Sequence, residues 1–165
     1  MATGRTSPRF SKMQIEDVNG VLRDIPVKTF GNVGLTYDEV DLSALQDLVK
    51  GFMTGQAAFS LTLTGPFDTT AAATASATTE ASGAHLSGSH TVLEPLDGGA
   101  TPLAFGIYFG IQADWAAGDP VFGADNSILV SDYTVDPASG MYSCKIIKAA
   151  GGTDPIWDTA QIAVV

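Results

Sequence analysis

The side chains best suited to acid–base or nucleophilic chemistry are few in this chain of 165 residues. Its two histidines, His85 and His90, lie in a segment rich in Ala, Thr, Ser and Gly, which is a poor place to hold a general base against a nucleophile. The single cysteine, Cys144, has Tyr142 and Ile146 at i±2, a pattern typical of a small core residue. We therefore expect no catalytic residues and no enzymatic activity.

Metal and cofactor sites are not predicted either. The acidic residues form no EF-hand run, and Asp114, Asp119 and Asp125 have the spacing of turn formers around residues 118–120, with a loose cation site as the alternative. No cysteine pair exists for a zinc site, and none of the 18 glycines belongs to a phosphate-binding loop. We expect neither a metal nor a cofactor.

The charge of the chain is acidic and unevenly distributed. Its formal net charge is −10, from 18 acidic and 8 basic residues, which disfavours a nucleic-acid-binding role because phosphates are repelled. Residues 51–144 contain no Lys or Arg at all. The middle of the chain therefore presents charge of one sign, for which solubility is the plain explanation.

The N-terminal residues 1–12 are polar and basic, with Arg5, Arg9 and Lys12. They lack the apolar stretch of a secretory signal, and no run of 18 apolar residues predicts a membrane span anywhere in the chain. We expect an exposed arm that docks on a neighbouring subunit, with a disordered tail as the alternative.

The clearest structural pattern is strict alternation over residues 103–113, which predicts a long strand. One face would be apolar and buried; it holds Leu103, Phe105, Ile107, Phe109 and Ile111. The other face carries two glycines, Tyr108 and Gln112. The glycines at 106 and 110 indicate a bend or the close approach of another backbone.

About nine strands are expected in total, which predicts an all-β sandwich or partial barrel formed by a single domain over residues 13–165. In residues 58–64 we expect Phe59, Leu61 and Leu63 to point inward. Asn19-Gly20 and the loop 136–140 predict hairpins. The other expected strands span residues 13–18, 21–25, 27–33, 35–40, 128–135, 141–148 and 160–164.

Three segments break this pattern. Residues 41–51 have Leu42, Leu45, Leu48 and Val49 at helical spacing, and Asp41 is placed to cap that helix. Residues 89–96 predict a short helix with a capping box at Thr91 and Glu94. Residues 69–90 form an Ala/Thr-rich loop insertion, too poor in apolar bulk to build a core.

The order of these features resembles the tail tube (major tail) proteins of long-tailed bacteriophages, the siphophage type. The resemblance covers nearly the whole chain without a diagnostic motif. The loop insertion is longer than that family's pattern, and residues 42–50 are more helical. The segments that carry the resemblance are residues 15–25, 34–44, 55–68 with its Thr-Leu-Thr-Gly-Pro-Phe-Asp turn, 89–93, 103–113, 118–123, 132–135 and 152–157.

The resemblance implies a virion protein, assembled in the host cytoplasm, whose copies form stacked and hexameric rings. Other tail proteins would be partners, and genomic DNA would pass through the tube without specific binding. An acidic lumen would suit that passage. The residues expected at subunit or ring interfaces are Arg5, Arg9, Lys12, Leu42, Leu45, Phe52 and Trp157; those expected to face the lumen are Tyr108, Gln112 and Asp114.

Two alternatives belong to other functional classes. A capsid decoration protein would also be small, β-rich and free of catalytic groups. A carbohydrate-binding or adhesin sandwich would need exposed aromatic side chains, for which Tyr108, Trp115 and Trp157 are the candidates.

Overall fold

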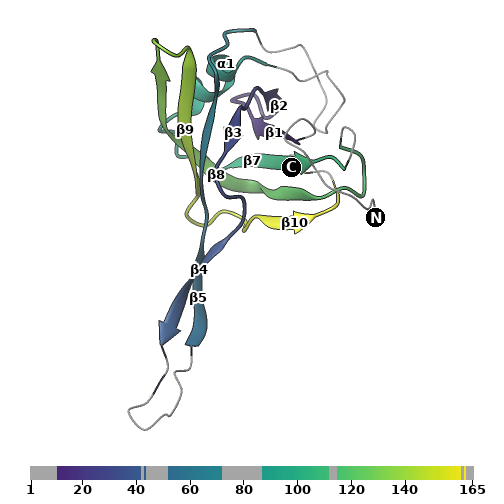
Figure 1. Ribbon diagram of the computed structural model, residues 1–165, viewed down its shortest axis with the longest axis vertical. Helices are drawn as coiled ribbons and strands as arrows, with labels where there is room; N and C mark the ends of the chain where they lie inside the picture. The colour runs from purple at the N-terminus through teal and green to yellow at the C-terminus, as the bar shows by residue number, and fades with distance from the viewer. Residues whose placement is uncertain are drawn as a thin grey trace.

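The computed structural model describes residues 11–41, 43, 52–71, 87–111, 115–160 and 162. Strands dominate these residues, with one short α-helix and one 3-10 turn (Figure 1). In chain order the elements are β1 (Ser11–Glu16), β2 (Leu22–Ile25), β3 (Thr29–Phe30), β4 (Thr36–Asp41), β5 (Phe52–Ala58), β6 (Ser60–Pro66), α1 (Ser89–Leu93), η2 (Glu94–Leu96), β7 (Leu103–Phe109), β8 (Val121–Asp136), β9 (Met141–Lys148) and β10 (Ile156–Asp158).

One antiparallel sheet forms the body. Its longest strand, β8, belongs both to the half that contains β2, β1 and β7 and to the half that contains β9, β6 and β3. The strand order is β2-β1-β7-β8-β9-β6-β3, and β10 also pairs with β8. The first part of β8 pairs with β7 and β10, while its second part pairs with β9. Asn126 and Asp132 have positive φ, and the β8–β9 register shifts between Ser131 and Thr134. Such irregularities bend a strand, so β8 can turn the corner between the two halves.

The two ends of the sheet meet because β2 leads directly into β3. The Lys28 N–H donates to the Thr64 carbonyl oxygen at 2.8 Å, which attaches the chain after β2 to β6. The Tyr142 hydroxyl donates to the Pro26 carbonyl oxygen at 3.0 Å. The sheet is thereby curled into a partial barrel. The predicted all-β class with one or two short helices is confirmed.

The core lies between the two halves of the curled sheet and is centred on three phenylalanines. Phe59 stacks on Phe105 at a centroid distance of 5.3 Å and contacts Phe122 at 5.6 Å. Leu61 and Leu63 are buried beside them, as predicted. Each fully buried side chain of this size contributes about 1.5–3 kcal/mol to stability. Helix α1 adds buried Val92 and Leu93 to the same core.

Close approach of another backbone, which the glycines of β7 predicted, occurs at Gly106. Gly106 is the register partner of Gly123 in β8. A Cβ on Gly123 would lie 2.2 Å from the Phe105 carbonyl oxygen, and a Cβ on Gly106 would lie 2.7 Å from the Tyr108 ring. A larger residue at Gly123 would push β8 away from the β7 backbone, whereas one at Gly106 would displace the Tyr108 ring.

Several predicted strand boundaries were wrong. The predicted strand 27–33 shrinks to the two residues of β3, and β5 was not predicted because Gly55, Gln56 and Ala57 give it no apolar alternation. β8 begins at Val121, well before residue 128. Ala160 and Ile162 lie outside any strand, and the last strand is the earlier β10.

The segments outside the strands also need correction. Ser11 and Lys12 belong to β1, so an arm comprises at most residues 1–10, which lie outside the described residues. Asp41 ends β4, and its carboxylate accepts the Ser43 N–H at 2.9 Å; the rest of the helix predicted over 41–51 lies outside the described residues.

The helix predicted over 89–96 is confirmed as α1 followed by η2, but its predicted capping box is wrong. Gly88 is the N-cap, without a side-chain cap. The Thr91 hydroxyl instead donates to the Thr70 carbonyl oxygen at 2.9 Å, because the loop returns to this side of the helix. Residues 72–86 of the predicted 69–90 insertion lie outside the described residues.

The turn between β1 and β2 contains a buried ion pair. The Arg23 Nε donates to the Asp17 Oδ2 at 2.8 Å, with side-chain exposures of 6% and 7%. Asp17 Oδ1 also accepts the N–H groups of Asn19 and Val21. The predicted Asn19-Gly20 hairpin is confirmed, and its turn depends on the Asp17 carboxylate.

Asp17→Ala should lower the free energy of unfolding by about 3 kcal/mol, because it leaves the Arg23 guanidinium buried without this carboxylate. Urea unfolding followed by circular dichroism measures the loss. Asp154→Ala is the control, since Asp154 pairs with Lys148 at 3.0 Å but is 71% exposed, and such pairs contribute at most about 1 kcal/mol. Equal losses in the two variants would contradict the assignment of the Asp17 pair as structural.

Candidate functional site

The most unusual feature of the molecule is the hairpin β4–β5, which projects from the body as a separate two-stranded sheet (Figure 1). Every residue of β4 is exposed. An isolated two-stranded hairpin is only marginally stable in water. Its base is anchored by Phe59, which directly follows β5 and is buried in the core.

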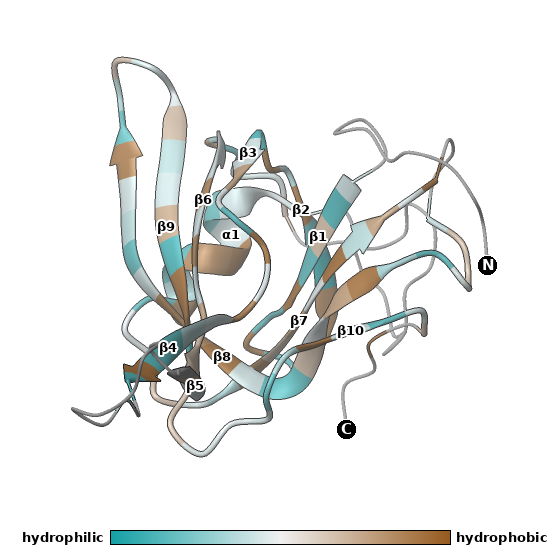
Figure 2. Cartoon of the chain, turned by 60° about the horizontal axis from the view of Figure 1, so that its bottom comes forward, coloured by the Kyte–Doolittle hydropathy of each residue, from teal (hydrophilic) through white to brown (hydrophobic). Residues whose placement is uncertain are grey.

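The hairpin combines exposed apolar side chains with acidic ones. Tyr37 is 55% exposed and Met53 is 52% exposed, and Val40 is the register partner of Met53. Asp38, Glu39 and Asp41 lie on the same strand, and the described part of the hairpin contains no Lys or Arg. In Figure 2 the hairpin points towards the viewer, and hydrophobic brown appears at the end of β4. Large exposed apolar residues on a projecting element mark an interaction surface.

A second surface is the solvent-facing side of the sheet formed by β3, β6, β9 and β8, which we call the hydroxyl face. Side chains alternate here between core and solvent, so the neighbours of buried Leu61, Leu63 and Cys144 point outward. The hydroxyl face comprises Thr29, Ser60, Thr62, Thr64, Ser131, Thr134 and Ser143, with Lys145 and the half-buried Leu129 and Ile147 among them.

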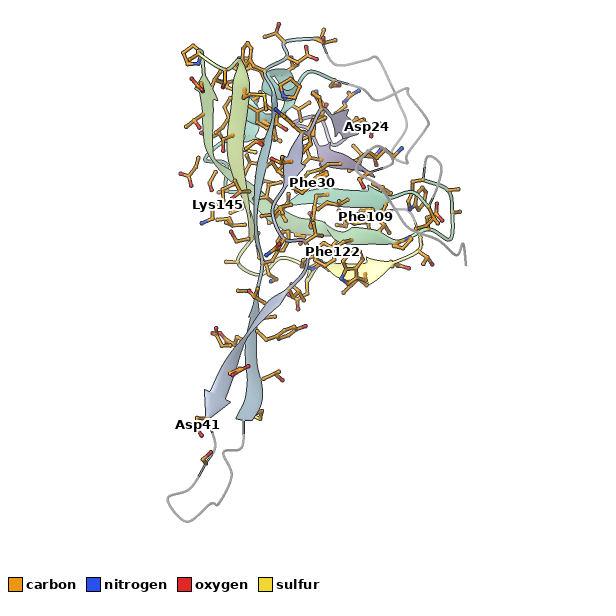
Figure 3. All side chains as sticks on the ribbon, viewed as in Figure 1. Asp24, Phe30, Asp41, Phe109, Phe122 and Lys145 are labelled. Atoms are coloured by element: carbon orange, nitrogen blue, oxygen red, sulfur yellow. The ribbon has the colours of Figure 1, made fainter. Side chains whose placement is uncertain are left out.

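Lys145 is the charged residue of this face. Its register partners are Thr62 and Ser131, and its side chain points away from the body (Figure 3). Strand β6 carries no charged residue. The hydroxyl face is therefore mainly polar, close to neutral and free of aromatic rings, with Leu129 and Ile147 as its apolar members.

A third surface is an apolar groove of about 330 Å³ between the base of the hairpin and strand β10, which we call the Trp157 groove. Trp157 is 55% exposed, yet its ring contacts Phe109 at 5.5 Å and Phe122 at 5.1 Å. Figure 3 places Phe109 and Phe122 close together at this end of the sheet. The lining residues are Gly34, Leu35, Tyr37, Phe122, Pro155, Ile156 and Trp157.

The structure overturns the prediction that Tyr108 faces a lumen. Tyr108 is fully buried, because the second face of β7 is covered. Its ring contacts Trp115 at 5.0 Å, and its hydroxyl oxygen accepts the Ile162 N–H at 3.3 Å. This burial raises the pKa of the Tyr108 phenol above its ordinary value. Lys12 Nζ lies 5.8 Å from the centre of the same ring, so Lys12 contacts its own subunit.

The structure describes only some of the other predicted site residues. Trp157 is exposed in the way an interface residue would be. Phe52 begins β5 at the far part of the hairpin. Arg5, Arg9, Leu42, Leu45, Gln112 and Asp114 lie outside the described residues. Sequence reasoning did not identify Tyr37, Met53 or the hydroxyl face, although the Ser60, Thr62, Thr64 alternation was a signal for the last.

The side chains that could act in acid–base chemistry or bind a metal make contacts that hold the fold together. His90 Nδ1 lies 3.2 Å from the Tyr133 hydroxyl oxygen, and its ring packs between Phe67 and Tyr133. Asp119 accepts the Ala116 N–H at 3.2 Å, as expected of a turn former. In the described part of the chain no three His, Cys, Asp or Glu residues gather as a metal site, and no helix is long and apolar enough to cross a membrane.

Comparison with known proteins gives matches in structure alone; no family model and no curated protein matches the sequence. A chain of the sheath-tube complex of an extracellular contractile injection system, PVC, in its extended state superposes with a TM-score of 0.53 at 10% identity, covering 94% of this chain and 93% of that chain. The tube-terminating cap of the anti-feeding prophage superposes with a TM-score of 0.56 at 12% identity, covering 97% and 95%.

At these identities the likeness establishes the fold. The chain has a fold that is also found in a chain of that sheath-tube complex and in that tube-terminating cap. The matched structures come from contractile systems, whereas the sequence pattern resembles the siphophage type.

Cys144 should be unreactive in the folded protein. Its side chain is buried, and burial raises the pKa of its thiol to about 12. Because the thiolate is the reactive form, an aromatic disulfide reagent at pH 8 should titrate no thiol in native protein and one thiol in urea. Rapid reaction of the native protein would contradict this buried position.

Proposed function

We propose that this protein is a structural subunit of a phage-tail-like tube, which self-assembles into stacked rings. The observation that carries the proposal is the projecting hairpin β4–β5. Tyr37, Val40 and Met53 are exposed on a two-stranded element that is separate from the body sheet. Covering them with another copy would remove apolar surface from water, and a head-to-tail contact of this kind repeats into rings or stacks.

We further propose that the hydroxyl face lines the channel of the tube. It continues directly from the hairpin, because β5 and β6 are separated only by Phe59. Protein interfaces are enriched in aromatic residues, which this face lacks, whereas the hairpin and the Trp157 groove have them. Hydroxyl groups interact weakly with a passing polymer, so DNA or another cargo could slide along such a wall. The wall would be near neutral rather than acidic.

In this proposal the protein acts without catalysis, as part of a virion or of a related tail-like particle. Hexameric rings and passage of DNA are expected from the resemblance to the siphophage tail tubes. The superposition on a tube-terminating cap supports a second candidate, a subunit that closes a tube. Electron microscopy distinguishes the two, because a tube protein forms long hollow filaments by itself, whereas a cap forms single rings. Trimers would instead favour a decoration protein.

The double substitution Tyr37→Asp with Met53→Asp should abolish assembly without unfolding the subunit. Burying each of these side chains contributes about 1.5–3 kcal/mol, so the assembly threshold concentration should rise at least tenfold. Sedimentation and electron microscopy measure assembly, and circular dichroism checks the fold. Val18→Asp is the matched control, since Val18 is an equally exposed apolar residue on the β1–β2 turn. Filaments that survive the double substitution would contradict the role of the hairpin.

Thr62→Cys tests the channel wall by size-selective labelling. Thr62 is exposed on β6, so in dissociated subunits the introduced thiol should react both with a small maleimide and with a maleimide on a bead wider than the tube. In assembled filaments only the small reagent should react, because it can enter through the ends. Reaction of intact filaments with the bead would place the hydroxyl face on the outside.

A further inference from the structure

We propose that the Trp157 groove is the receptor for the N-terminal arm of a second copy of this chain. The inference rests on the proposed self-assembly and adds to it the two surfaces that meet.

The groove is bordered by two strands that each pair on one side only within the described residues. β4 pairs with β5, and β10 pairs with β8. Within the described residues the other edge of each strand leaves backbone donors and acceptors without a strand partner, and Tyr37 of β4, Ile156 and Trp157 of β10 and Phe122 of β8 line the groove. An extended segment entering such a groove can satisfy these backbone groups as an added strand. The geometry therefore selects an extended peptide.

The chemistry of the groove favours a segment that is both cationic and apolar. Its lining contains exposed Tyr37, Ile156 and Trp157 and no Lys or Arg. Acidic residues flank the lining segments in sequence: Asp38 and Glu39 follow Tyr37, and Asp158 follows Trp157. Arginine suits this setting because it pairs with carboxylates and stacks on aromatic rings.

The ten residues that precede β1 have the matching composition. They carry Arg5 and Arg9 with no acidic residue, and Phe10 supplies an aromatic anchor. A fully extended segment of this length spans about 33 Å, which is enough to reach across a subunit boundary. Residues 51–144 contain no Lys or Arg, so they cannot supply a cationic segment for the groove.

The direction of β1 favours a second copy over the same one. Ser11, the first residue of β1, pairs with Phe109 at the end of β7. Since β7 and β10 both run antiparallel to β8, the arm leaves the sheet at the end where β10 finishes with Asp158. The groove lies towards the start of β10, at Pro155 and Ile156. An arm would have to reverse to enter its own groove, whereas one that continues outward meets a neighbour.

Disulfide trapping tests this contact. Chains carrying Phe10→Cys are mixed with chains carrying Ile156→Cys, allowed to assemble and oxidised, and the linked peptides are mapped by mass spectrometry. Because each chain carries only one of the two cysteine substitutions, only a contact between two copies can form the disulfide. Buried Cys144 gives a low background. Val135→Cys in place of Ile156→Cys is the matched control, since Val135 is exposed at the opposite end of β8.

We expect the 10–156 disulfide in assembled particles and at least tenfold less of it in the control mixture. Arg5→Glu with Arg9→Glu should raise the assembly threshold concentration at least tenfold. Filaments that form without the disulfide and tolerate the arginine substitutions would overturn the inference and leave the proposed tube intact. A disulfide that forms only within single chains carrying both Phe10→Cys and Ile156→Cys would also overturn it. So would a disulfide that forms between Met53→Cys chains and Ile156→Cys chains in place of the 10–156 disulfide. If neither particles nor disulfide form, both proposals fail.

Discussion

The aromatic contact of Phe59 with Phe105 and Phe122 is the interaction on which the other surfaces depend. Phe59 stands between β5 and β6, so its burial decides where the body ends and the exposed hairpin begins. The Lys148 N–H also donates to its carbonyl oxygen at 3.2 Å, which holds this point of the chain against β9. Phe122 in turn supports the exposed Trp157 ring. A single core cluster therefore positions both the hairpin and the groove.

The surfaces around this core differ in chemistry in a way that suits different tasks. The hairpin and the Trp157 groove are apolar with acidic residues nearby, and they suit contacts between copies of the chain. The hydroxyl face has a single lysine and no aromatic ring, and it suits contact with water and a passing polymer. This separation gives physical meaning to the acidic composition: the carboxylates need not line a channel to make the protein unsuited to gripping DNA.

The sequence predicted the strands whose apolar residues alternate cleanly. Phe59 just before β6 and Leu61 and Leu63 within it point inward. Leu103, Phe105 and Ile107 are buried in β7. It failed where local pattern competes with tertiary context. β5 has no alternation, because neither of its faces meets the core. Tyr108 was assigned to a solvent-facing side, since alternation identifies two faces of a strand but does not tell whether another part of the chain covers the second one.

By itself the sequence determined the all-β class, the inward faces of β6 and β7 and the hairpins, because these follow from local periodicity and turn chemistry. Only the tertiary structure decided that β8 bends to serve both halves of the sheet, that β4 and β5 leave the body, and that Trp157, Ile156 and Tyr37 line one groove. In the groove, Tyr37 lies beside Ile156 and Trp157, which come more than a hundred positions later in the sequence. No local pattern encodes these juxtapositions, since they arise from how the sheet curls around its core.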